Sequence, residues 1–178
     1  MKQVENITYE EWVALVRRAG LDGLTGEVFE ALQVYYPLSS GSAYEKMIYN
    51  EMAKLEMQLL KKSIHRFQNA INLCMEENDL EIAKAAINSF RKNIAQCMFF
   101  VEVEAFPKEL REKLSSDIYA NILQFQKEVD CFSKKAMSEN SGNFVQDLCY
   151  LLKKHNLAKI VMERKKNAQL YTSKEGID

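Results

Sequence analysis

The sequence predicts an all-α protein, an elongated antiparallel three-helix bundle with a short helical hairpin before it and two short helices after it. Its 178 residues include only two prolines and six glycines, which leaves few breaks for a many-stranded sheet. Apolar residues also recur at spacings of three and four through three long segments. The length suits one domain with a real core. We expect residues 1–38 to pack on a bundle of residues 42–138, followed by short helices over 143–170.

The N-terminal hairpin begins with Thr8 and Glu11, which have the spacing of a capping box. A first helix should run to about Ala19 and stop at Gly20, burying Trp12, Val13 and Val16. After the turn "LDGLTG", a second short helix is expected to end at Pro37; its apolar residues are Val28, Phe29, Leu32 and Tyr36.

The bundle opens after "PLSSGS", where Ser42 and Glu45 form a second capping box. A long helix is predicted from there to about Glu77. Its apolar face comprises Ile48, Met52, Leu55, Leu59, Leu60, Ile64, Phe67, Ile71 and Cys74. At Asn78–Glu81 a third capping box follows almost without a loop, which predicts an antiparallel helical hairpin.

The next two helices have equally regular apolar seams. The first is formed by Leu80, Ala83, Ile87, Phe90, Ile94, Cys97 and Val101. The second helix should begin at Pro107, a favoured first helical position, and its seam is Leu110, Leu114, Ile118, Ile122, Phe125, Val129 and Phe132. The pattern Phe-x3-Ile-x2-Cys occurs at both Phe67 and Phe90 and loosely at Phe125, which we interpret as a shared core pattern rather than a repeat array.

Beyond the linker "SENSGN", the apolar residues change phase. Val145, Leu148, Cys149 and Leu152 share one face, whereas Leu157, Ile160 and Val161 would point the opposite way in a continuous helix. The change falls at His155–Asn156, and Asn is a good helix C-cap. Two short helices are therefore expected. Leu148–Leu152 also matches an L-x-x-L-L interaction motif, which we interpret as ordinary core.

The stretch "CMFFVEVEAFPKEL" from Cys97 to Leu110 has two interpretations. Its alternation suggests a strand, but a helical seam runs into it and no second strand is available to pair with a first. We therefore predict a helix. Phe99, Val103 and Phe106 fall on the side away from the seam. We expect the N-terminal helices to cover them, with Trp12 contributing; the alternatives are an exposed partner-binding patch or a homodimer contact.

Few residues of the sequence are candidates for catalysis or metal binding. Neither histidine, His65 or His155, has the Glu-x-x-His spacing of a di-iron bundle, and no nucleophile, phosphate-loop or dinucleotide motif is present. The four cysteines, Cys74, Cys97, Cys131 and Cys149, have no C-x-x-C spacing, and we expect reduced thiols within the apolar seams of a cytoplasmic protein. The sequence thus predicts no cofactor, no metal, no catalytic residue and no membrane span.

A basic segment near the C-terminus is the remaining candidate for a binding site. It combines Lys153, Lys154, Lys159, Arg164, Lys165 and Lys166 with a single acid, Glu163. Such a segment can contact phosphates, but we favour the interpretation that it is a solvated helix face, because it has no interleaved aromatic residue before Tyr171 and no helix-turn-helix spacing.

Three functional hypotheses remain open. The first is a non-enzymatic protein-binding regulator or inhibitor that occupies a macromolecular partner, of the kind that phages and mobile elements encode. The second is a nucleic-acid-binding accessory protein that uses the basic segment. The third is a homodimeric structural bundle. The net charge of −1 gives no overall attraction to nucleic acid or to an anionic membrane.

Overall fold

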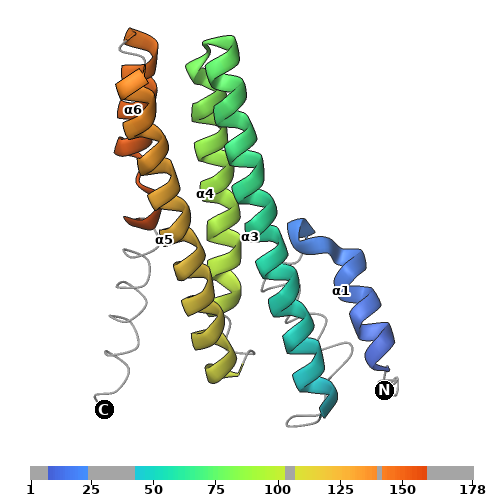
Figure 1. Cartoon of the computed structure of the whole chain (residues 1–178). Coiled ribbons are helices and arrows are strands. Elements are labelled where there is room, and N and C mark those ends of the chain that lie inside the picture. The colour runs from blue at the N-terminus through green and yellow to red at the C-terminus, as the bar shows by residue number, and fades with distance from the viewer. Residues whose placement is uncertain (1–7, 24–42, 103–106, 140–141, 160–178) are drawn as a thin grey trace, which may run out of the picture. The chain divides into compact units, whose positions relative to one another are not determined.

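A computed structural model of the chain describes residues 8–23, 43–102, 107–139 and 142–159, and every regular element within them is helical (Figure 1). The all-α prediction is therefore confirmed for this part of the chain. The helices are α1 (Tyr9–Gly23), α3 (Ala43–Glu77), α4 (Leu80–Glu102), α5 (Lys108–Glu139) and α6 (Asn143–Lys154). One further helical turn covers residues 157–159. None of the described helices is long and apolar enough to cross a membrane.

The chain divides into two compact units, and each is described separately. Unit 1 comprises Met1–Lys61 and Ala95–Ser115, and unit 2 comprises Lys62–Ile94 and Ser116–Asp178. The helices α3, α4 and α5 contribute residues to both units. The expectation of a single domain built from residues 1–38, 42–138 and 143–170 stays a prediction.

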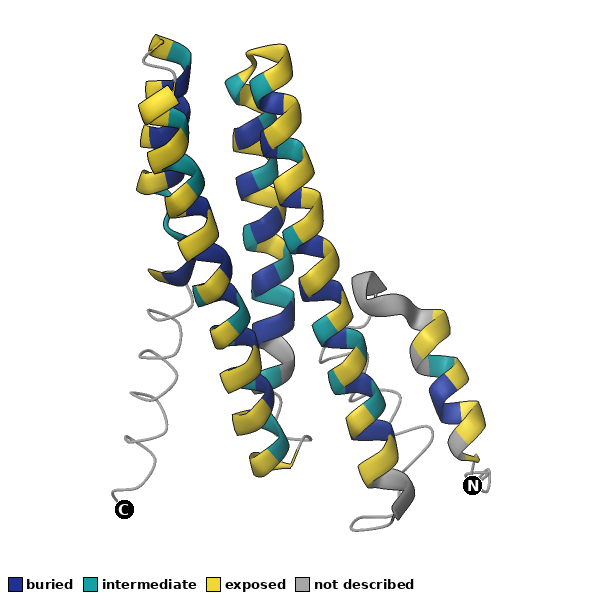
Figure 2. Cartoon of the chain, viewed as in Figure 1, coloured by how far each residue is buried: buried dark blue, intermediate teal, exposed yellow. Residues whose placement is uncertain are grey.

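The predicted seams are the buried faces of the long helices, as the dark stripes in Figure 2 show. Most seam residues are fully buried, and the others, among them Leu55, Ile64 and Phe132, are half-buried. Helical periodicity identified this core because residues three or four apart lie on one side of a helix.

The start of α1 confirms the first capping box. The Thr8 N–H donates to Glu11 Oε2 at 2.7 Å, and the Glu11 N–H donates to Thr8 Oγ1 at 3.3 Å. The predicted end at Gly20 is wrong, since α1 continues to Gly23. An isolated glycine weakens a helix by about 1 kcal/mol relative to alanine but does not by itself terminate it. The second short helix expected before Pro37, and the capping residue Ser42, lie outside the described residues.

The α3–α4 junction is as tight as predicted, but a different residue caps α4. Asn78 has a positive φ of 52°, and the N–H of Asp79 donates to the carbonyl of Cys74 at 3.2 Å, which closes α3 in a Schellman-type turn. Asp79 Oδ1 then accepts from the N–H of Glu81 at 2.9 Å. Asp79 is therefore the N-cap, and Asn78 has the left-handed conformation that its short polar side chain tolerates.

The stretch Cys97–Leu110, for which the sequence left a strand and a helix as interpretations, contains no strand in its described residues. Cys97–Glu102 forms the end of α4, so the strand interpretation is wrong for these residues. Val103–Phe106 lie outside the described residues. Pro107 precedes α5 instead of being its first residue, and its carbonyl accepts from the N–H of Arg111 at 3.0 Å. This bond makes Pro107 the N-cap, one position from the prediction.

The predicted break after α6 is present, with different capping roles. His155 is the C-cap of α6, and its N–H donates to the carbonyl of Leu151 at 3.1 Å. Asn156 Oδ1 accepts from the N–H of Lys159 at 2.9 Å. Asn156 therefore caps the start of the next helical turn and not the end of α6, as its short side chain favours.

Three phenylalanines from three helices form the centre of unit 2. The ring centroids of Phe67 on α3, Phe90 on α4 and Phe125 on α5 lie 5.4 to 5.5 Å apart. All three side chains are buried. These are the phenylalanines of the recurring sequence pattern, so the pattern reflects one shared core, as interpreted.

Two side-chain contacts define how α3 and α4 are aligned in unit 2. Besides the Phe67–Phe90 contact, Asn93 Nδ2 donates to Ser63 Oγ at 2.9 Å. Ser63 is buried and Asn93 is half-buried. This hydrogen bond helps to fix the register of the two helices. If one helix slipped along the other, the Asn93 amide and the Ser63 hydroxyl would lose their hydrogen bond to each other.

In unit 1, α1 packs along the first half of α3. Trp12 is buried, as predicted, and Ile48, Tyr49 and Met52 on α3 are buried as well. Arg17 Nη2 on α1 forms an ion pair with Glu51 Oε1 on α3 at 2.8 Å. The side chain of Val16, which the sequence also placed in this core, lies outside what the structure describes.

Candidate functional site

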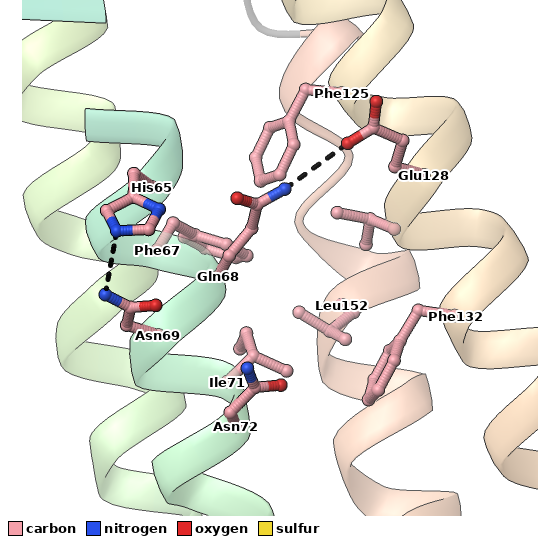
Figure 3. A pocket seen from close by; sticks show the side chains of 11 residues that line it. His65, Phe67, Gln68, Asn69, Ile71, Asn72, Phe125, Glu128, Phe132 and Leu152 are labelled. Atoms are coloured by element: carbon pink, nitrogen blue, oxygen red, sulfur yellow. Dashed lines mark hydrogen bonds between the residues drawn. The ribbon is translucent and has the colours of Figure 1, made fainter. Parts of the chain in front are cut away.

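The best-formed concave site in the described part of the chain is a pocket of about 360 Å³ in unit 2, which we call the α3–α5–α6 pocket. Its apolar walls come from all three helices (Figure 3) and comprise Phe67, Ile71, Phe125, Val129, Phe132 and Leu152. Most of these side chains are buried, and Phe132 is half-buried. The pocket thus extends from the seams of the helices to the surface.

The rim of the pocket is polar and nearly neutral. It is formed by His65, Gln68, Asn69 and Asn72 on α3 and by Glu128 on α5. Gln68 Nε2 donates to Glu128 Oε2 across the space between the helices at 3.3 Å, as the dashed line in Figure 3 shows. On the α3 side, Asn69 Nδ2 donates to His65 Nε2 at 3.3 Å. All five rim side chains belong to exposed residues, so the rim can rearrange around a ligand without disturbing the core.

Helical geometry explains how these residues come together. Gln68, Asn72, Glu128 and Phe132 form two i, i+4 pairs, one on α3 and one on α5, and each pair lies on one face of its helix. Leu152 on α6 forms part of the pocket wall. Apolar walls with a few polar groups at the mouth are the usual composition of a binding pocket.

No protein-family model, curated protein or solved structure matches the chain.

A smaller pocket of about 260 Å³ lies between α3 and α4 in unit 2. Small side chains, Ala85, Ala86 and Ser89, form its α4 side, and Phe67 and Phe90 contribute from the core. Arg66 is its one charged lining residue. It is smaller than the α3–α5–α6 pocket and has two large apolar side chains in its lining instead of six, so the α3–α5–α6 pocket is the stronger candidate.

The structure places only part of the surfaces expected from the sequence. Phe99 belongs to α4, but its side chain, like Val103 and Phe106, lies outside what the structure describes, so the patch stays a prediction. Of the basic segment, Lys153 and Lys154 are exposed at the end of α6 and Lys159 is exposed in the turn that follows. Arg164, Lys165 and Lys166 lie outside the described residues.

The L-x-x-L-L motif is core, as interpreted. Leu148 and Leu152 are buried and Leu151 is half-buried. Only Tyr150, inside the motif, is largely exposed, with a relative accessibility of 69%. The motif is therefore the apolar face of α6.

The four cysteines are free thiols in two environments. Cys74, Cys97 and Cys149 are buried in the seams, as expected, whereas Cys131 is exposed, so its predicted place in a seam is wrong. Cys131 lies between Asp130 and Phe132, one residue off the apolar stripe of α5. Burial raises the pKa of the Cys149 thiol, and its Sγ donates to the carbonyl of Ser133 at 3.6 Å. Within the described ranges, no cluster of three or more histidine, cysteine or acidic side chains is arranged to hold a metal ion.

A buried carboxyl in unit 1 was not predicted. Glu56 on α3 is only 1% exposed, and neither of its carboxyl oxygens has a hydrogen-bond partner. Burial raises the pKa of Glu56 to about 7, and the nearby Cys97 thiol on α4 opposes that rise without reaching hydrogen-bonding geometry. Burial, followed by the charge of Glu56, raises the pKa of Cys97 in turn. The carboxyl is thus half-protonated near neutral pH.

A second buried polar residue, Gln126, joins two elements of unit 2. Its Oε1 accepts from the N–H of Leu157 at 2.8 Å, and its Nε2 donates to Asp130 Oδ1 at 2.9 Å. The first bond satisfies a free amide at the start of the helical turn 157–159. Gln126 thereby fixes the chain after α6 against α5.

His155, a lone histidine in the sequence, belongs to the same region of unit 2. Its Nδ1 accepts from Arg91 Nη2 on α4 at 2.9 Å, since a guanidinium can only donate. Burial, followed by the charges of Arg91 and Lys154, lowers the pKa of His155. The ring is therefore a structural acceptor in its neutral form.

Proposed function

We propose that the chain is a non-enzymatic protein-binding regulator or inhibitor that acts by occupying a macromolecular partner, and that it holds this partner at the α3–α5–α6 pocket. The observation that supports this proposal is the pocket itself, with apolar walls from three helices and a rim of exposed polar side chains. Protein interfaces combine an apolar centre with a polar rim in the same way. A helix-lined apolar groove is also a common receptor for a partner helix.

The proposal includes the finer architecture expected from the sequence, an antiparallel bundle of α3, α4 and α5. The phenylalanine cluster, to which each of the three helices contributes one ring, supports this arrangement. The tight turn at Asn78–Asp79 supports an antiparallel α3–α4 pair. A cytoplasmic location is part of the same proposal, since Cys74, Cys97 and Cys149 are buried free thiols. An origin in a phage or mobile element stays a hypothesis.

A pocket-blocking substitution tests the proposed function. Asn72 is an exposed rim residue, so Asn72→Arg should place a bulky side chain at the mouth without disturbing the core. The matched control is Asn88→Arg, an exposed residue on α4 that does not line the pocket. In affinity capture from the native host, quantified by mass spectrometry with and without nuclease, one protein should be retained by the wild type and by Asn88→Arg and lost with Asn72→Arg. Equal capture by all three would contradict the proposal.

The patch of Phe99, Val103 and Phe106 provides the competing location for a partner or a second copy of the chain. Phe99→Asp distinguishes the two alternatives for this patch. If the patch is covered, the substitution buries an unpaired carboxylate and lowers the stability of the protein by several kcal/mol. If the patch is an open binding surface, the thermal melt stays unchanged, while partner capture or the dimer mass in light scattering is lost.

Nucleic-acid binding is the second candidate function, because Lys153 and Lys154 are exposed at the end of α6 and Lys159 is exposed in the turn that follows. Replacing these three lysines with Gln should weaken retention on DNA or RNA and flatten its salt dependence, since fewer counterions are released. No retention of the wild type at low salt would exclude this function.

A further inference from the structure

The rim of the α3–α5–α6 pocket has one full charge, that of Glu128. It is the only carboxylate among the residues that line the pocket, and none of them is lysine or arginine. Glu128 is exposed and lies on the α5 side of the mouth (Figure 3). The pocket therefore presents a single negative charge directly beside an apolar cavity.

The hydrogen bonds of Glu128 are long and come from neutral donors. Gln68 Nε2 donates to one carboxylate oxygen at 3.3 Å, and Gln124 Nε2 donates to the other at 3.4 Å. Both distances exceed the usual 2.7–3.2 Å of an N–H···O bond, and bonds from an ammonium or guanidinium to a carboxylate are shorter still. The ion pairs found among the described residues involve other acids, namely Glu51, Glu81, Glu112 and Glu139. A cation from a partner would thus replace two weak bonds with a stronger one.

The apolar part of the pocket sets the second requirement. Phe132 is half-buried and Leu152 is buried, and together with Phe125 they border the space next to Glu128 (Figure 3). A volume of about 360 Å³ is near the lower end of the range for ligand pockets. It suits one large apolar side chain rather than an extended hydrophobic surface. Aromatic anchors of this kind, next to arginine, dominate the binding energy of many interfaces.

We propose that the α3–α5–α6 pocket binds a helical segment of a partner protein that inserts one large apolar side chain and places a lysine or arginine, one helical turn away, on Glu128. This inference rests on the proposed function and specifies the partner segment. The spacing follows from helix geometry, because residues three or four apart lie on the same face of a helix and can reach the cavity and its rim together. The charge of Glu128 then selects among apolar helices and favours basic over acidic ones.

The test is a selection of helical peptides displayed on phage, with randomised side chains on one face, against the folded full-length protein. The enriched peptides should share a large apolar residue with Lys or Arg three or four positions away. They should bind Glu128→Lys about three- to tenfold more weakly, since the substitution turns attraction into repulsion at an exposed site. Gln68→Lys should also weaken them, because it supplies Glu128 with a cation from within the chain. The matched control Asp117→Lys, an exposed acid elsewhere on α5 in unit 2, should leave their affinity unchanged.

The outcomes separate this inference from the proposed function. In the first outcome, the enriched peptides lose binding with Asn72→Arg, but they share no basic residue or they bind Glu128→Lys as well as the wild type. That result would overturn the inference and leave the pocket as a protein-binding site. In the second outcome, all enriched peptides bind Asn72→Arg and Phe132→Ala as tightly as the wild type, or no peptide is enriched. That result would overturn the inference and also the proposed function of the pocket. Circular dichroism of each variant confirms that it is folded.

Discussion

The buried carboxyl of Glu56 should make the stability of unit 1 fall as the pH rises. Its pKa is about 7 in the folded protein against an ordinary 4.5, and burial is the main cause. Between these two values the folded state holds a proton that the unfolded state has released. The free energy of unfolding therefore decreases as the pH rises from about 4.5 to about 7, and remains lower above that range.

The size of the effect follows from the difference between the two pKa values. At about 1.4 kcal/mol per pH unit, the difference in pKa corresponds to a loss of about 3 kcal/mol in the free energy of unfolding between pH 4.5 and pH 8. Glu56→Gln keeps the shape of the side chain and removes the ionisation. The variant should match the wild type to within about 1 kcal/mol at pH 5 and be more stable by about 2–3 kcal/mol at pH 8, because only the wild type has a buried charge there.

The assay is urea unfolding at pH 5 and pH 8, followed by tryptophan fluorescence. Trp12 is the only tryptophan in the chain and is buried in unit 1, so its emission reports on the unit that contains Glu56. Glu76→Gln, at an exposed position on the same helix, is the control and should behave like the wild type at both pH values. If the stability difference between Glu56→Gln and the wild type is the same at pH 5 and pH 8, the reasoning from burial is refuted.

Three further predictions concern unit 2. Gln126→Leu should lower the free energy of unfolding by about 1–3 kcal/mol in urea denaturation, because the buried N–H of Leu157 loses its acceptor; an unchanged midpoint would contradict the capping role. Phe90→Ala should cost about 3–5 kcal/mol in the same assay, since it removes one of the three buried rings of the phenylalanine cluster and leaves a cavity, whereas a loss under 1 kcal/mol would show that the rings do not form the core. The pKa of His155, measured by NMR titration, should lie below 6.5, and the neutral ring's contribution to the stability of unit 2 should therefore be lost as the pH falls below 6.5. Arg91→Gln should raise this pKa, and an unchanged pKa would argue against the Arg91–His155 contact.

The helices of this protein were largely predictable from the sequence, because the interactions that define them are local. The capping box at Thr8 and Glu11 and the break after α6 depend on residues within four positions of each other. The errors were local too. Gly20 does not end α1, and Asp79, not Asn78, caps α4, since neighbouring polar residues compete for one capping position.

The candidate site depended on the tertiary structure. Gln68 and Glu128 are sixty positions apart, and nothing in either local pattern indicates that they meet at the mouth of one pocket. Glu56 and Gln126 look like ordinary polar residues of amphipathic helices, and their burial became visible only through the neighbouring helices. A sequence determines which face of each helix is apolar, because that face is set by spacing along one chain segment. Which polar residues border that face, and which become enclosed with it, is decided by how separate segments pack together.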